Sequence, residues 1–424
     1  MSAAPIPFPA QQKLQAIVGP THARPAGPAD HVSGVQPRFV VEPGTEAELA
    51  EVLHLSNEAG LAVIPRGGGT KLGWGNPPAR ADLILSTARL NQIIEHAWAD
   101  LTVTVEAGCT IQKLQQTLAQ HGQRLALDPL WPENATVGGV LSANDSGALR
   151  LRFGALRDLI IGVTIALPDG TLASSGGKVV KNVAGYDLPK LATGALGTLG
   201  VITRASFRLH PLPLNSRTFS IPATDAEQAQ KFVLAIQDSK LAHTSLQSHF
   251  SSQSSPSADI LFEGTIAGIA AQEEQFRALA APAKVVEASS QAWATRGSLW
   301  NLSDAECTAI AKISLLPTHL SSLVDSVAQA TKAHELLWRA LVYGIGLGWL
   351  RLEGTPSGLH SALQQLRRTL EDLGGSLVIL HHPEKMSPLD AWGSSGDSLG
   401  LMKSVKARLD PKSTLNPGRL VGGI

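Results

Sequence analysis

One stretch of the sequence constrains the fold more than any other, a glycine-rich loop that directly follows a short apolar strand. The strand is expected over Leu61 to Ile64, and the loop runs from Pro65 to Gly75 with the letters PRGGGTKLGWG. Glycines lack a Cβ, so successive backbone amides can converge on an anion. Arg66 and Lys71 add positive charge, and Thr70 adds a hydroxyl donor. We interpret the loop as a cradle for a diphosphate; a flexible surface loop is the alternative.

Two common phosphate-binding folds do not fit these letters. A dinucleotide-binding fingerprint needs Gly-x-Gly-x-x-Gly at the start of a helix, but the sixth position counted from Gly67 is Leu72. Asn76-Pro77-Pro78 then follows in place of a helical pattern. A Walker A loop needs Gly-Lys-Ser/Thr, and this tripeptide does not occur in the chain. A nicotinamide-type Rossmann site and a P-loop NTPase are therefore both disfavoured.

The chain around this loop alternates strand and helix patterns up to about residue 212. One helix is predicted to begin at a capping box, Thr45-Glu46-Ala47-Glu48, and to end at Gly60. A second helix has an apolar face and ends at Gly122. Further strands are predicted over residues 38–41, 101–107 and 159–167. These patterns indicate an α+β domain.

Two later clusters of small residues stand at intervals along the same domain. Counting the glycine-rich loop as the first cluster, the second is Asp128-Pro129 followed by Ala135 to Gly147, which mixes glycines and hydroxyls around a short predicted helix. The third runs from Gly176 to Leu188 and continues from Gly194 to Thr203. Each cluster alone is explained equally well by tight packing and turns.

Taken together, in this order and spacing, the clusters resemble the FAD-binding lobe of the vanillyl-alcohol oxidase and p-cresol methylhydroxylase (PCMH) superfamily. Within it, the sequence is most similar to the FAD-binding subunits of bacterial-type glycolate oxidases. The likeness is strong over about residues 38–212 and in the last twenty or so residues, and weak between them. The letters that carry it are Pro65 to Gly75, Ala135 to Gly147, Lys181 to Leu191, Gly194 to Ile202 and the tail Met402 to Arg419.

The resemblance implies an α+β fold with a two-subdomain PCMH-type FAD-binding domain, a second α+β cap domain, and a C-terminal segment that returns to the FAD domain. The expected divisions are an N-terminal extension and first helix at 1–37, the FAD domain at 38–212, a cap or partner-binding domain at 213–400, and the returning segment at 401–424. The paired prolines in His210-Pro211-Leu212-Pro213 mark the main boundary.

The cofactor implied by the resemblance is FAD. Some relatives attach the flavin through a histidine in the first loop, and this loop has none, so non-covalent binding is expected. The loop would hold the pyrophosphate, the second cluster would line the dinucleotide, and Val201 and Ile202 would lie near the adenine or flavin edge. The expected cofactor-binding residues are Pro65, Arg66, Gly67, Gly68, Gly69, Thr70, Lys71, Leu72, Asp128, Ala135, Thr136, Val137, Gly138, Gly139, Ser142, Asn144, Gly147, Val201 and Ile202.

Catalytic residues are not identified by the sequence. The catalytic flavoprotein subunits of the family carry a stretch that resembles His-x-Gly-Asp-Gly-Asn-x-His, and it is absent here. His381 and His382 are the nearest in kind, but neighbours on a strand point to opposite faces, so they are a poor metal site. Lys312, Arg339 and Arg351 are conceivable carboxylate anchors, with ordinary salt bridges as the alternative.

Charge and cysteine content exclude several other functions. The 35 basic and 35 acidic residues cancel, and no basic run is interleaved with aromatics, so nucleic acid is not an expected partner. Met1 to Pro20 has no signal-peptide pattern and four prolines that oppose a helix, and no stretch is long and apolar enough to span a membrane. With only two cysteines, an iron–sulfur cluster held by four thiolates in this chain is excluded.

These observations favour an FAD-binding subunit of a glycolate or D-lactate dehydrogenase or oxidase complex. Its expected partners are a catalytic flavoprotein subunit and an iron–sulfur subunit, which would receive the electrons. The expected location is cytoplasmic, including peripheral attachment to the inner face of the membrane through those subunits. Two alternatives stay open, namely an independent FAD-dependent oxidase of another alcohol or hydroxy acid, and a structural subunit with a vestigial flavin site.

Overall fold

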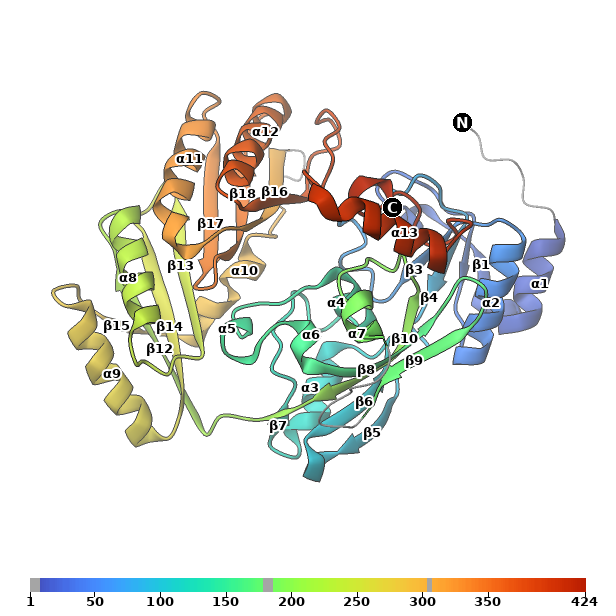
Figure 1. Ribbon diagram of the computed structural model, residues 1–424, viewed down its shortest axis with the longest axis horizontal. Coiled ribbons are helices and arrows are strands. Elements are labelled where there is room, and N and C mark those ends of the chain that lie inside the picture. Colours follow the sequence, from blue (N-terminus) through green and yellow to red (C-terminus); the bar gives the residue numbers. More distant parts are fainter. Residues whose placement is uncertain (1–7, 178–185, 303–306) are drawn as a thin grey trace. The chain divides into compact units, whose positions relative to one another are not determined.

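The chain divides into two compact units in the computed structural model, which describes residues 8–177, 186–302 and 307–424 (Figure 1). Unit 1 comprises residues 1–146, 155–212 and 395–424, and unit 2 comprises residues 147–154 and 213–394. The part of the third glycine cluster from Lys178 to Gly185 lies outside the described residues.

The first sheet of unit 1 carries the glycine-rich loop. Its strand order is β1-β2-β4-β3, with β2, β4 and β3 parallel and β1 antiparallel. The strands are β1 (Ala23–Pro25), β2 (Phe39–Val41), β3 (Val63–Arg66) and β4 (Leu83–Ser86). Parallel neighbours need a crossover connection, usually a helix. Between β3 and β4 this connection is the helix-free segment 67–82, which begins with the loop.

Two helices, α1 (Phe8–Val18) and α2 (Glu46–Glu58), pack side by side and share an apolar core with this sheet. The predicted capping box is present in a slightly shifted form. The Thr45 hydroxyl accepts from the Glu48 amide, and the Glu48 carboxylate accepts from the amide of Gly44 instead of that of Thr45. The expectation that prolines oppose a helix up to Pro20 was wrong for residues 8–18. Pro9 stands in the first turn of α1, where a missing amide hydrogen costs no intrahelical bond.

The second sheet of unit 1 is antiparallel, in the order β5-β6-β10-β8-β9. The predicted strands and helices lie close to their expected places. The elements are β5 (Ile93–Ala97), β6 (Thr102–Glu106), α3 (Ile111–Ala119), α4 (Val137–Ala143), α6 (Leu156–Leu159), β8 (Ile160–Ala166), β9 (Leu172–Gly176), α7 (Leu188–Ala192) and β10 (Val201–Arg208). A two-residue strand β11 (His210–Pro211) pairs with β7 (Gln123–Arg124), although the prolines there were expected to break such pairing.

The C-terminal segment returns to unit 1, as the fold prediction requires. Helix α13 (Leu399–Leu409) leads into a tail that lies beside β3. The Val63 amide donates to the Thr414 carbonyl at 2.7 Å, and the Asn416 amide donates to the Val63 carbonyl at 2.9 Å. Leu415 between them is fully buried in the core of the first sheet. The tail therefore holds β3 at the point where the glycine-rich loop begins.

Unit 2 is built from two copies of the same βαββαβ arrangement. The first copy is β12 (Asn215–Pro222), α8 (Ala226–Asp238), β13 (Ser245–Ser251), β14 (Ser257–Gly264), α9 (Ile266–Ala280) and β15 (Val286–Ala288). The second is β16 (Thr308–Ser314), α11 (Leu320–Lys332), β17 (Leu337–Tyr343), β18 (Leu347–Glu353), α12 (Pro356–Asp372) and β19 (Ser376–His381). The sheet order, β15-β12-β14-β13-β17-β18-β16-β19, gives both copies the same internal order and joins them through equivalent strands.

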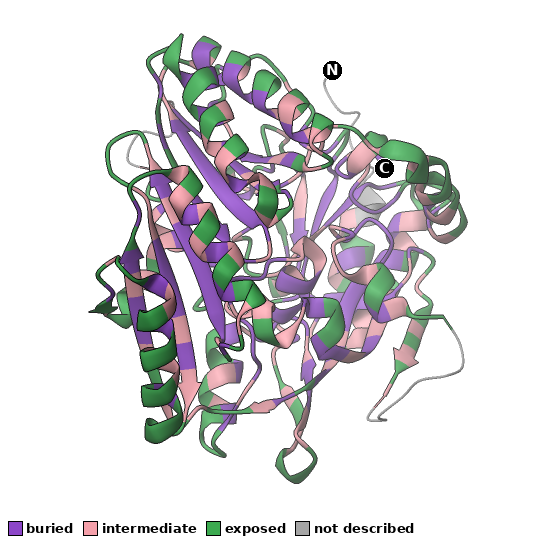
Figure 2. Ribbon diagram, turned by 60° about the vertical axis from the view of Figure 1, so that its left-hand side comes forward, coloured by how far each residue is buried: buried purple, intermediate pink, exposed green. Residues whose placement is uncertain are grey.

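One face of this eight-stranded sheet packs against the four long helices α8, α9, α11 and α12. The shared core includes the ring cluster of Phe219, Phe262 and Phe276 and the leucines of α12. In Figure 2 the long strands are largely buried, whereas the helices alternate between buried and exposed residues. The helical patterns near Ala267 to Ala280 and Gly358 to Leu373 correspond to α9 and α12. Among the described residues, no helix has the length and apolarity needed to cross a bilayer.

Candidate functional site

The glycine-rich loop lies directly against the start of the second cluster. A Cβ added to Gly68 would stand 1.7 Å from the carbonyl oxygen of Asn134, and one added to Gly67 would stand 2.0 Å from the hydroxyl of Thr136. Gly69 has a φ of +75°, which side-chain-bearing residues rarely adopt. Gly68 is therefore required for the close approach of the two backbone segments, Gly67 leaves room for the Thr136 side chain, and Gly69 permits the left-handed turn.

Helix α4 supplies the other wall of the site. Thr136 caps it, its hydroxyl accepting from the Gly139 amide at 3.4 Å. Gly138 lets the helix start against β6, because a Cβ there would stand 2.8 Å from that of Ala107. At the far end, the amides of Gly194 and Leu196 donate to carbonyls of α4 at 2.9 Å each. The second and third glycine clusters thus fix the two ends of one short helix.

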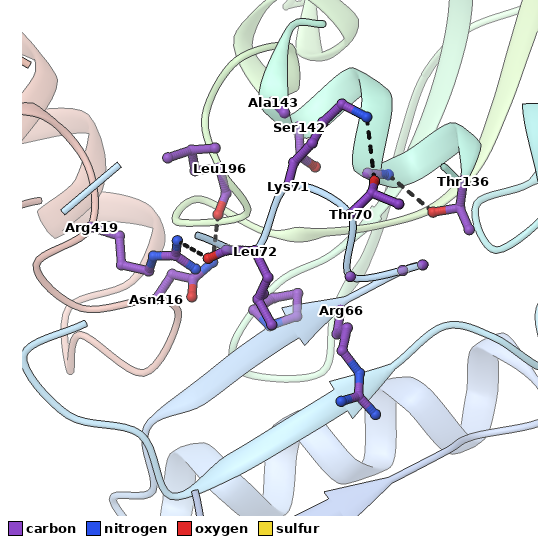
Figure 3. A pocket seen from close by; sticks show the side chains of 15 residues that line it. Arg66, Thr70, Lys71, Leu72, Thr136, Ser142, Ala143, Leu196, Asn416 and Arg419 are labelled. Atoms are coloured by element: carbon purple, nitrogen blue, oxygen red, sulfur yellow. Dashed lines mark hydrogen bonds between the residues drawn. The ribbon is translucent and has the colours of Figure 1, made fainter. Parts of the chain in front are cut away.

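The two positive side chains of the loop are engaged with the protein. Lys71 is buried, with its Nζ 3.1 Å from a carboxylate oxygen of Asp145 and 3.1 Å from the Leu130 carbonyl. Arg66 donates to Asp30 at 2.8 Å, and in Figure 3 its side chain extends away from the other labelled residues. The guanidinium of Arg24 is the main cause that holds the pKa of Asp30 well below its usual range. The positive charge that the loop offers to an anion is therefore partly balanced.

The C-terminal tail braces the loop from the other side. Arg419 is buried and donates to the carbonyls of Leu72 and Trp74, and burial lowers its pKa to about 10. The Asn416 amide group donates to the carbonyl of Leu196. Figure 3 shows both tail residues beside Leu72 and Leu196.

The tail itself is fixed by a buried ion pair. Lys406 donates to Asp410 at 2.6 Å and to the carbonyls of Thr198 and Leu415 at 2.8 and 2.9 Å. The Asp410 carboxylate also accepts from the backbone amides of Thr414 and Leu415, each at 2.8 Å.

These segments line two adjoining pockets in unit 1, which are named the loop lobe and the strand lobe and are together called the pocket. The loop lobe and the strand lobe share Pro65, Arg66, Gly67, Gly139, Ser142 and Leu196. The loop lobe adds Gly68, Gly69, Thr70, Lys71, Leu72, Thr136, Ala143, Asn416 and Arg419. The strand lobe adds Thr87, Gly138, Gly197, Gly200, Val201 and Ile202. Neither lobe is lined by a carboxylate among the described residues.

Most of the residues expected at the cofactor are brought together by this pocket. Pro65 to Leu72, Thr136, Gly138, Gly139, Ser142, Val201 and Ile202 all line it. The structure does not place Asp128, Ala135, Val137, Asn144 or Gly147 in its walls. Ala135 and Val137 are buried in the packing around α4, Asn144 forms its left-handed C-cap, and Gly147 belongs to unit 2. Seven further lining residues were not predicted from the sequence, namely Thr87, Ala143, Leu196, Gly197, Gly200, Asn416 and Arg419. All of them except Thr87 stand inside the motifs that carry the family resemblance.

The conceivable substrate-binding residues of unit 2 are held in other contacts. Arg351 is buried and donates to the carbonyls of Leu299 and Asn301 at 2.7 and 3.0 Å, while Arg339 pairs with Glu353 at 3.2 Å. Lys312 is half-buried within β16. His381 ends β19, and His382 lies just beyond it. Within the described ranges, no group of three or more residues could hold a metal ion.

The pocket fits FAD by its own chemistry. Gly67 to Gly69 expose backbone where any Cβ would collide or strain, which suits close approach of a pyrophosphate. The Ser142 hydroxyl lines both lobes and has no hydrogen-bond partner among the described residues. Positive side chains and the lack of lining carboxylates favour an anionic ligand.

Comparisons with known proteins also support FAD as the ligand of this pocket. The family model for the FAD binding domain matches residues 37–176, and that for the C-terminal domain of FAD linked oxidases matches residues 393–420. The glycolate oxidase subunit GlcD of Bacillus subtilis is 26% identical over 419 residues, which cover 91% of this chain and 89% of that protein. The D-lactate dehydrogenase of Archaeoglobus fulgidus is 34% identical over 198 residues, 46% of this chain and 44% of that one.

Solved structures confirm the fold. The structure of p-cresol methylhydroxylase with substrate bound superposes with a TM-score of 0.77 at 15% identity, covering 97% of this chain and 96% of that chain. The predicted PCMH-type fold, the FAD cofactor and the oxidoreductase class are therefore confirmed. The chain is thus similar to FAD-linked oxidoreductases over most of its length, and it matches the family models for the FAD binding domain and for the C-terminal domain of FAD linked oxidases at residues 37–176 and 393–420.

Proposed function

We propose that this chain is the FAD-bearing subunit of a dehydrogenase or oxidase complex that acts on glycolate or D-lactate. The observation that carries the proposal is that the glycine loop packs on residues 134–136 and is braced by the C-terminal tail. The pocket that results has a lining suited to a dinucleotide. The similarity to a glycolate oxidase subunit over 91% of this chain supports the substrate class. Bound FAD would supply the acceptor for the hydride of a 2-hydroxy acid.

The residues of the pocket would hold the cofactor without a covalent bond. Backbone amides of Gly67 to Gly69 would bind the pyrophosphate, and the hydroxyls of Thr70 and Ser142 would donate to its oxygens or to the sugar parts. The segment from Pro65 to Gly75 contains no histidine or cysteine that could attach the flavin. Acid precipitation should therefore release intact FAD, and flavin that stayed on the denatured chain would contradict this binding mode.

Two features support a role within a complex. The His-x-Gly-Asp-Gly-Asn-x-His stretch of the catalytic flavoprotein subunits is absent, and only two cysteines are present. Substrate turnover would then depend on a catalytic flavoprotein subunit, and onward transfer on an iron–sulfur subunit. In this proposal the complex is cytoplasmic or attached peripherally to the inner face of the membrane.

Reconstitution tests the proposal. The purified chain, loaded with FAD, is assayed with glycolate and D-lactate and an artificial electron acceptor, alone and with the two partner subunits. The proposal expects turnover only in the complex. Full-rate turnover by the isolated chain would support an independent oxidase instead, and a complex that is fully active with a flavin-free form of this chain would support a vestigial site.

A further inference from the structure

The backbone of Thr87 is fixed by hydrogen bonds at the C-terminal end of strand β4 in the first sheet. It directly follows β4, and its amide donates to the Arg66 carbonyl at 2.9 Å, so it stands beside the start of the glycine-rich loop. Its own carbonyl accepts from the Leu90 amide at 2.9 Å, and a Cβ on Gly108 would stand 1.9 Å from that same carbonyl oxygen. The backbone of Thr87 is thus fully engaged, and the residue cannot shift easily.

The side chain of Thr87, in contrast, is unused by the protein. The residue is only 5% exposed, yet within the part of the chain that the structure describes its hydroxyl has no hydrogen-bond partner. The hydroxyl oxygen is not fully enclosed by protein, so water or a ligand can reach it, as is usual for a polar group that lacks a protein partner. Because Thr87 lines the strand lobe, a ligand in this lobe can satisfy the hydroxyl.

The strand lobe has a different chemistry from the loop lobe. The residues that only the strand lobe contains are Thr87, three glycines, Val201 and Ile202, and none of them is charged. Val201 and Ile202 are 2% and 5% exposed. Such a wall of glycine backbone and buried aliphatic side chains suits a flat, uncharged ring.

We propose that the strand lobe takes the adenine ring of FAD and that the Thr87 hydroxyl is its hydrogen-bonding partner. The inference rests on FAD binding by this pocket. A threonine hydroxyl both donates and accepts, so it can pair with a ring nitrogen or with the exocyclic amino group of adenine. The flavin ring is the poorer occupant, because its reacting edge must meet a substrate and the residues that only this lobe contains are all buried.

The test compares variants of Thr87 in the full-length chain freed of flavin. Thr87→Val removes the hydroxyl at nearly constant volume, and Thr87→Ser keeps it. Dissociation constants for FAD, ADP and FMN are measured by fluorescence titration and displacement, together with the thermal midpoint of each flavin-free variant. Thr104→Val is the matched control, since Thr104 is 8% exposed and its hydroxyl is bonded to that of Ser206 in the second sheet, outside the pocket.

The Thr87→Val variant is expected to bind FAD and ADP about threefold to tenfold more weakly, with FMN binding unchanged. Thr87→Ser should restore both to within about twofold of the original. Equal weakening of FMN and ADP, or no weakening of ADP, would overturn the assignment. Where the valine variant does not fold, Thr87→Ala removes the hydroxyl without added bulk and is judged by the same criteria. A parent chain that binds no FAD at all would refute the cofactor site itself, which is a separate result.

Discussion

The two units of this chain use their polar groups differently. On the sheet of unit 2, Asp259 accepts from His249 at 2.6 Å, from Gln247 at 2.9 Å and from Ser220. In unit 1, the hydroxyls of Thr87 and Ser142 line a pocket and lack hydrogen-bond partners among the described residues. The Asp259 network is satisfied within the protein. Unpartnered hydroxyls also occur in the described part of unit 2, at Ser245 and Ser248 of β13, but those are fully buried, whereas Thr87 and Ser142 line a pocket that a ligand can enter.

The largest loss of stability, accompanied by a loss of FAD affinity, is expected when the buried ion pair of the tail, Lys406 with Asp410, is broken. Lys406→Met leaves Asp410 without its cation in a fully buried position and should lower the free energy of unfolding of unit 1 by about 3–5 kcal/mol. FAD affinity should fall with it, because the tail carries Asn416 and Arg419. Denaturant unfolding and FAD titration measure the two effects.

Lys190→Met is the matched control, because its pair with Asp187 is more than half exposed on both sides. Exposed pairs add little to stability. No measurable change is expected in this variant. If Lys406→Met behaved in the same way, the tail would not be a structural part of the site.

A smaller effect, confined to unit 2, is expected from its core. Phe276 is fully buried against Phe219 and Phe262, and Phe276→Leu should destabilise unit 2 by about 1–2 kcal/mol. FAD affinity should stay within about twofold of the original, because the pocket is lined by unit 1 alone. A parallel loss of FAD affinity would show that the contrast between the units is wrong.

The smallest effect is expected at Asp259 and depends on pH. Burial alone would raise the pKa of this carboxyl, but hydrogen bonds from His249, Ser220 and Gln247 together hold it below its usual value. A lowered pKa in the folded state contributes stability above the unfolded pKa of about 4, and this contribution is lost as the pH falls through the folded value.

Asp259→Asn should therefore cost about 1 kcal/mol at pH 7, and the difference from the parent chain should shrink below about pH 4. Denaturant unfolding over a pH series measures it. A difference that stayed constant down to pH 3 would mean that the carboxylate charge contributes nothing.

The sequence was most informative where only one residue type fits. At Gly67, Gly68 and Gly138 a neighbouring atom lies too close to leave room for a Cβ. The glycines in the sequence were therefore enough to predict the loop and the start of α4. Charge was less informative, because the letters of Arg66 and Lys71 do not show their pairing with Asp30 and Asp145. Thr87 belongs to no recognisable motif. It lies at the pocket because the parallel pairing of β3 and β4 brings it beside Arg66, and the sequence alone does not show that pairing.

The architecture of unit 2 could not be derived from its letters. The two βαββαβ copies need only the usual periodic patterns of apolar residues, and very different sequences provide such patterns. The sequence therefore predicted the helices α9 and α12 but not the duplication. The tail posed the opposite problem. Its motif was recognised, but its contacts with the loop join residues more than 340 positions apart, Arg419 with Leu72 and Trp74.

The central claim is that the glycine-rich loop holds FAD by close backbone approach, and one pair of variants in that loop tests it most directly. Gly68→Ala would place a Cβ 1.7 Å from the Asn134 carbonyl oxygen, whereas Gly73→Ala adds a Cβ with no atom within 4 Å. FAD titration of both flavin-free variants should give about 100-fold weaker binding for Gly68→Ala and unchanged binding for Gly73→Ala. Equal affinities in the two variants would contradict the account.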